Sequence, residues 1–129
     1  MKKLVKDWLS LAEKDLKAAQ IIVERDDDLT NVVCFHCQQC LEKLLKASLI
    51  ANNEDVPRTH NLLKLYGMAR EKLKIAFDMT MLEMINDIYT DARYPSDLGL
   101  LPDGLPSKEK ARQFCDFTKD IYLKIKESL

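Results

Sequence analysis

The stretch Cys34-Phe-His-Cys-Gln-Gln-Cys-Leu-Glu-Lys-Leu-Leu-Lys46 decides the fold, because its apolar residues recur at helical spacing. They belong to one stripe: Val33, Cys37, Cys40, Leu44 and Ala47, flanked by Leu41, Leu45 and Ser48. Steps of three and four residues bring such side chains to one face of an α-helix. We therefore predict a helix from about Thr30, as its N-cap, to about Asn52, ended by the approach to Pro57.

Helical periodicity continues on both sides of this stretch. Upstream, apolar residues at alternating steps of four and three predict a helix over residues 5–24: Val5, Leu9, Ala12, Leu16, Ala19 and Val23. Downstream, a shorter helix follows Thr59, and its inward side holds Leu62, Leu63, Tyr66, Ala69 and Leu73. The pattern Thr80-Met-Leu-Glu83 is typical of a capping box and predicts the start of a fourth helix.

A fifth helix is expected from Ser107 to the end of the chain. Residues 93–106 contain three prolines and two glycines, which predicts a loop before it. No segment alternates as a strand would. We therefore predict a single all-α domain over residues 1–129, an antiparallel up-and-down four-helix bundle with an additional short helix.

Composition narrows the function. The chain has 129 residues, a hydrophobic content of 47% and a net charge of −1. It therefore has no overall positive charge that would attract nucleic acid or an anionic membrane, and any such binding would have to be local. No run approaches the roughly 18 apolar residues that a membrane span needs. The basic start at Met1 is not followed by an apolar core, so we expect no signal peptide and a cytoplasmic protein with reduced cysteines.

Three of the four cysteines, Cys34, Cys37 and Cys40, have a spacing that could indicate zinc or an iron–sulfur cluster. In a helix, however, this spacing spreads the thiols over about 9 Å of the axis. The fourth, Cys115, is distant in the sequence. We therefore expect the cysteines to act as small apolar core residues that bind no metal, and we expect no cofactor.

Polar residues in the central segment could form a binding site. His36, Gln39 and Lys43 fall on one helical face, close to the apolar stripe. One explanation is that this face, with Glu42 and Lys46, is the solvated back of the helix. The other is a polar pocket inside the bundle, because polar groups near a core are usually hydrogen-bonded to a specific partner.

A second group of polar residues lies at the predicted end of the fourth helix. Arg93 offers a planar fork for carboxylate or phosphate, and Tyr94 offers a stacking face. Alternatively, Arg93 only compensates the helix dipole. His60 opens the third helix, and alone such a histidine is more often structural than catalytic.

Four segments together resemble the HEPN family (higher eukaryotes and prokaryotes, nucleotide-binding). They are Trp8…Ala12-Glu-Lys-Asp-Leu16…Ala19, Phe35-His-Cys-Gln-Gln-Cys-Leu-Glu-Lys43, Thr59-His-Asn-Leu62 and Ala92-Arg-Tyr-Pro95. The resemblance implies a bundle of about five helices, often dimeric. It also implies frequent association with minimal nucleotidyltransferases in toxin–antitoxin or stress-response systems.

Many members of this family are metal-independent ribonucleases in which four to six residues separate an arginine from a histidine. The chain departs from that motif. The corresponding positions before its only two histidines are Leu29, Thr30 and Asn31 for His36, and Asn53, Glu54 and Asp55 for His60.

The resemblance therefore favours a non-catalytic module that binds a nucleotide, a nucleic acid or a nucleotidyltransferase partner. The expected site residues are Gln39, Lys43, His60, Arg93 and Tyr94. Two alternatives remain open: a ribonuclease with a variant pair, Arg93 and His60, and a purely structural dimerisation module. We expect a homodimer, from the resemblance and from the apolar residues Leu41 and Phe117 beside the main stripes.

Overall fold

The computed structural model of the chain describes residues 1–93 and 105–129, and the side chains of residues 1–87 and 105–129. The described residues form five helices and no strand: α1 Lys3–Arg25, α2 Thr30–Ala51, α3 Leu62–Leu73, α4 Met79–Arg93 and α5 Lys108–Ser128. The predicted all-helical bundle is thus confirmed. Most of the predicted loop at 93–106 lies outside the described residues.

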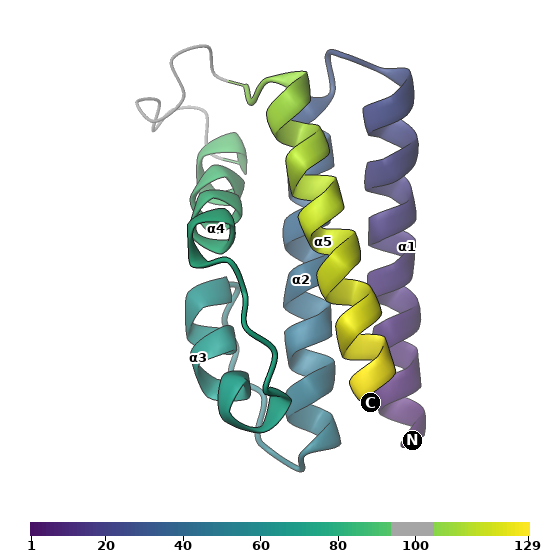
Figure 1. Cartoon of the computed structure of the whole chain (residues 1–129), viewed down its shortest axis with the longest axis vertical. Helices are drawn as coiled ribbons and strands as arrows, with labels where there is room; N and C mark the ends of the chain where they lie inside the picture. The colour runs from purple at the N-terminus through teal and green to yellow at the C-terminus, as the bar shows by residue number, and fades with distance from the viewer. Residues whose placement is uncertain (94–104) are drawn as a thin grey trace.

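The second helix, α2, is the centre of the bundle, since it packs against each of the other four helices. The long helices α1, α2 and α5 run beside one another, and both chain ends lie at the same end of the bundle (Figure 1). The shorter α3 and α4 stand one below the other along the remaining side of α2 (Figure 1). A helix surrounded in this way must bury nearly its whole circumference.

The predicted core stripes are largely confirmed. The buried residues of α1 are the six predicted from the sequence: Val5, Leu9, Ala12, Leu16, Ala19 and Val23. All eight predicted core residues of α2 are also fully buried. In α3, however, Leu65 is buried in addition to the predicted residues, and Leu63 is only half-buried.

The second helix begins at Thr30 as predicted, but two predicted helix caps, Thr30 and Thr80, are wrong. Thr30 is already helical and buried, and the N-cap position belongs to Leu29, whose side chain makes no capping hydrogen bond. Thr80 lies inside α4, since a carboxylate upstream of it does the capping: Asp78 Oδ1 accepts a hydrogen bond from the Met81 amide at 3.2 Å. When several residues near a helix start carry a side-chain oxygen, the sequence does not show which of these oxygens accepts a hydrogen bond from a backbone amide of the first turn.

The fifth helix, α5, begins at Lys108, one residue after the predicted start, and Ser107 is its N-cap: the Ser107 hydroxyl accepts a hydrogen bond from the Lys110 amide at 3.0 Å. Asn61 caps α3 by accepting from the Leu63 and Lys64 amides at 3.0 and 3.2 Å. This cap fixes where α3 begins. His60, which was predicted to open this helix, lies before the cap and contacts α2 instead.

The two residues that suggested a dimer face differ in their accessibility within the chain. Leu41 is fully buried, and Phe117 is half-buried against the core. Leu41 is inaccessible because α2 packs against each of the other four helices. Other apolar side chains on the outside of the long helices are exposed instead: Leu4, Leu11 and Ile21 on α1, and Leu123 on α5.

Candidate functional site

A buried amide organises the polar side of α2. Gln38, which is 0% exposed, donates from Nε2 to the His60 carbonyl at 2.9 Å and to Glu42 Oε1 at 3.3 Å. Its Oε1 accepts from Gln39 Nε2 at 2.8 Å. Gln38 therefore joins two of the predicted site residues, Gln39 and His60, across the contact between α2 and the start of α3.

Glu42 is the charged centre of the same network. Its Oε1 lies 2.9 Å from His60 Nδ1, and its Oε2 accepts from Lys46 Nζ at 3.0 Å. As whole residues, Glu42 is 5% exposed and Lys46 is 9% exposed, so the two form a buried ion pair within one helix. The side chain of His60, by contrast, is 65% exposed and brings the network to the surface. We refer to Gln38, Glu42, Lys46 and His60 as the Glu42 cluster.

The burial of Glu42 and Lys46 rules out the interpretation of this face as a solvated helix back. Together with Gln38 they repeat every four residues, which aligns them on one side of the helix. This spacing is visible in the sequence and could have indicated that the three side chains interact with one another. Charged residues are rarely buried unless paired, so composition alone favoured the opposite assignment.

A second cluster lies between α1 and α2. Asp15 Oδ1 lies 3.0 Å from His36 Nδ1, and Asp15 Oδ2 accepts a hydrogen bond from Lys43 Nζ. The exposed fractions of these side chains are 13% for Asp15, 26% for His36 and 22% for Lys43. The cluster is therefore half-buried and open to solvent on one side. We refer to these three residues as the Asp15 cluster.

A further contact ties α3 to α4. Asn86 Oδ1 accepts a hydrogen bond from the Leu62 amide at 2.9 Å. Arg93 is the last residue of α4, two turns beyond Asn86 or about 10 Å along the axis. The side chain of Arg93 and the whole of Tyr94 lie outside the described residues.

The five predicted site residues are thus only partly brought together among the described side chains. Gln39 and His60 share the Glu42 cluster through Gln38, while Lys43 is paired with Asp15 on the neighbouring helix. Sequence reasoning missed Asp15, because its partners come from another helix. Each cluster joins an imidazole and an ammonium group to one carboxylate, so an anionic ligand would have to share the ammonium group with Asp15 or Glu42.

Each side-chain oxygen and nitrogen that is fully buried in the described part has a hydrogen-bond partner. Within the same part, no three side chains among histidine, cysteine, aspartate and glutamate are placed to hold a metal ion. The helices described also include none with the length and apolar character to cross a membrane. The polar groups of the site are therefore organised by one another.

Comparison with known proteins places this geometry in a family. The family model of the HEPN domain matches residues 5–128. A crystal structure of TT1696 from Thermus thermophilus superposes with a TM-score of 0.83 at 24% identity, covering 99% of this chain and 100% of the other. ST0689, described as an archaeal HEPN homologue, gives a TM-score of 0.73 at 24% identity over 99% and 98% of the two chains. No curated protein gives a significant match. Because the family model covers nearly the whole sequence, the chain belongs to the HEPN domain family.

Proposed function

We propose that the protein is a non-catalytic HEPN module that binds a nucleotide, a nucleic-acid segment or a partner minimal nucleotidyltransferase, as one half of a toxin–antitoxin-like or stress-response pair. The carrying observation is that separate sequence segments meet on one side of the bundle. Gln38 of α2 holds the His60 carbonyl before α3, and Asn86 of α4 holds the first amide of α3. These contacts bring α2 and the start of α3 to the helix that ends at Arg93.

In this proposal each predicted residue has a chemical role. Lys43 and Arg93 contact phosphate, since a cation and a planar fork are the usual partners of that group. Tyr94 stacks on a base. Gln39 and His60 donate or accept hydrogen bonds at a base edge or sugar. Lys43 is paired with Asp15 in the free protein, so phosphate binding involves exchange of one anion for another.

The sequence supports a non-catalytic role. Neither of the two histidines follows an arginine at the spacing used by the ribonucleases of this family. The proposal also includes a homodimer, as is common in the family. The exposed apolar residues Leu4, Leu11, Ile21 and Leu123 are the candidates for its interface. Light scattering at micromolar concentration should return twice the 14.9 kDa of the chain, and a mass of one chain would contradict the dimer.

Calorimetric titration with nucleoside triphosphates and short single-stranded RNA tests the binding site. Lys43→Ala should weaken binding by about 1–3 kcal/mol, the worth of a charge-assisted hydrogen bond. Lys124→Ala is the matched control, because Lys124 forms an exposed pair with Asp120 on α5. Arg93→Ala should weaken binding to a similar degree. A loss of melting temperature in the Lys43 or Arg93 variant with unchanged binding would refute the assigned site.

Partner capture needs a separate experiment. The protein should be purified from its native cells with a mild affinity tag and analysed for bound nucleotides and proteins by mass spectrometry. Recovery of a small nucleotidyltransferase at a constant ratio would support the paired system. Its recovery should fall in the Lys43 and Arg93 variants if these residues contact the partner.

One observation favours a second candidate, a ribonuclease with a variant site at Arg93 and His60. The Glu42 carboxylate lies 2.9 Å from Nδ1 of a surface imidazole, an arrangement that orients a general base. Cleavage of a fluorescent RNA without added metal, lost in His60→Ala and retained in His36→Ala, would support this candidate. Absence of cleavage by the wild type would eliminate it.

A further inference from the structure

Two thiols distant in the sequence meet where α2 faces α5. Cys37 Sγ donates a hydrogen bond to Cys115 Sγ at a distance of 3.9 Å, although 78 positions separate the residues along the chain. Cys37 is fully buried and Cys115 is 4% exposed. The hydroxyl of Thr118, one turn beyond Cys115, also lies against Cys37. The two sulfur atoms are therefore in contact, within a short movement of the roughly 2 Å length of a disulfide bond.

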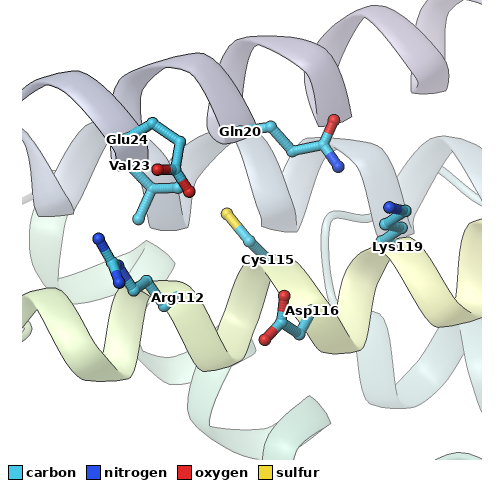
Figure 2. A pocket seen from close by; sticks show the side chains of 7 residues that line it. All are labelled: Gln20, Val23, Glu24, Arg112, Cys115, Asp116 and Lys119. Atoms are coloured by element: carbon cyan, nitrogen blue, oxygen red, sulfur yellow. The ribbon is translucent and has the colours of Figure 1, made fainter.

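Only one of these sulfurs faces an opening. A groove of about 360 Å³ lies between α1 and α5, and Cys115 lines it. Its other lining residues are Gln20, Val23, Glu24, Arg112, Asp116 and Lys119. Figure 2 shows the Cys115 sulfur pointing from α5 toward α1, with Arg112 and Lys119 on either side along α5. A small oxidant can thus reach Cys115, while Cys37 lies behind it.

The two thiols differ in acidity. The hydrogen bond from Cys37 lowers the pKa of Cys115, and the same contact together with burial raises the pKa of Cys37 well above its usual range. Burial is the main reason why the pKa of Cys34 is raised to about 12 and why that of Cys40 is also raised. The thiolate of the pair therefore forms on Cys115, the member that lines the groove, and thiolates are the reactive form of cysteine.

We propose that Cys115 is a peroxide-reactive thiol and that Cys37 resolves it into a disulfide between α5 and α2. The Cys115 thiol gives up its proton, and the thiolate attacks one oxygen of hydrogen peroxide. The O–O bond breaks, Cys115 becomes a sulfenic acid, and the second oxygen leaves as hydroxide, which takes up that proton to form water. The Cys37 sulfur then attacks the Cys115 sulfur, the S–O bond breaks, and its oxygen leaves as water with the proton of Cys37. Two thiols lose two electrons in total, hydrogen peroxide is reduced to two waters, and a dithiol reductant reverses the bond.

The disulfide would constrain α2, the helix that contributes residues to both the Glu42 cluster and the Asp15 cluster. It would fasten α2, the central helix, to α5 and close a loop that contains α3 and α4. A disulfide of this kind in a reducing compartment forms transiently, as redox-sensing disulfides do.

The test is oxidation of the full chain with a small excess of hydrogen peroxide, followed by intact mass analysis under denaturing, non-reducing conditions. We expect a monomer that has lost two hydrogens, restored by dithiothreitol. A variant with Cys34→Ala and Cys40→Ala retains only the proposed pair and should oxidise at the wild-type rate. A product with added oxygen only, a cross-link between two chains, or no change in mass would overturn the proposal.

Single variants separate the two roles. Cys115→Ala should abolish the reaction, whereas Cys37→Ala should stop at a sulfenic acid on Cys115 that dimedone labels. A disulfide between Cys115 and Cys34 in the wild type would contradict the role of Cys37. Dimedone labelling at Cys37 would contradict the role of Cys115. Circular dichroism of each variant establishes that it is folded before oxidation.

The groove carboxylates provide an independent measurement. Glu24 and Asp116 both oppose ionisation of Cys115, so Asp116→Asn should raise the rate of dimedone labelling in the Cys37→Ala background several-fold. Asp120→Asn, one turn further along α5 and outside the groove lining, is the matched control. Equal rates in the two variants would show that the groove does not control the thiol and would overturn its role.

Discussion

The Glu42 cluster and the Asp15 cluster use the same three kinds of side chain in different surroundings. Each joins a carboxylate to an imidazole and to a lysine on α2. The Glu42 side chain is 7% exposed and its lysine 11%, whereas Asp15 is 13% exposed and its lysine 22%. Removing one member of a buried ion pair leaves an unpaired charge away from water, which lowers the free energy of unfolding strongly. When one member of a solvent-accessible pair is removed, water or another ion can solvate the remaining charge, so the loss is small.

This difference suggests a division of roles. The buried cluster should contribute mainly to stability and to the relative placement of α2 and α3. The half-buried cluster should be more available to a ligand. A third carboxylate, Glu13, extends the series toward solvent, since its side chain is 38% exposed and accepts a hydrogen bond from Tyr122.

The largest effect is expected at Glu42. Glu42→Ala leaves Lys46 as a buried charge without its carboxylate and should lower the free energy of unfolding by about 3–5 kcal/mol. Urea denaturation measures this loss. The double variant Glu42→Leu/Lys46→Met removes both charges and should recover most of the stability, because an apolar pair of similar volume avoids the desolvation cost. A single-variant loss below about 1 kcal/mol would show that the Glu42 cluster behaves like a surface pair.

An intermediate effect is expected at Asp15. Asp15→Asn keeps the shape but removes the charge that holds His36 and Lys43, and should lower stability by about 1–2 kcal/mol. If Lys43 contacts phosphate, the freed ammonium should also bind nucleotide more tightly, by about 1 kcal/mol. Asp120→Asn on α5 is the control, since its ion pair with Lys124 is exposed. Weaker nucleotide binding in Asp15→Asn would contradict the role of Lys43.

The smallest effect is expected at Tyr122, and it depends on pH. Burial, and then the hydrogen bond to Glu13, raise the pKa of Tyr122 above its ordinary value. The folded protein therefore keeps this proton at alkaline pH, while the unfolded chain loses it near pH 10. The stabilisation is complete below about pH 10 and declines as the pH rises further, because the unfolded state then binds fewer protons.

Unfolding curves for wild type and Tyr122→Phe measure this contribution. Between about pH 10 and 11 the wild type should lose about 1 kcal/mol more stability than the variant. At pH 7 the variant should differ from wild type by about 1 kcal/mol. Parallel curves across the alkaline range would show that Tyr122 titrates alike in the folded and unfolded protein.

The sequence alone determined the helices and most of the core. Residues such as Val5, Leu9 and Leu16 recur at a helical period, and burial of apolar surface enforces that period in the fold. The start of α5 near Ser107 was identifiable, because the prolines and glycines of the preceding segment end there. The family was also identifiable, since its motifs are short and occur in order along the chain.

The tertiary structure decided which distant residues meet. Asp15 and His36, Glu42 and His60, and Cys37 and Cys115 are each held together by the packing of different segments. A period in the sequence fixes the face on which a side chain lies, but not the neighbour opposite that face. This is why Lys46 could be read as solvated although it is buried, and why Cys115 gave no sign of its partner. Helical periodicity is a local property, whereas the pairing of charges and thiols depends on how the five helices pack.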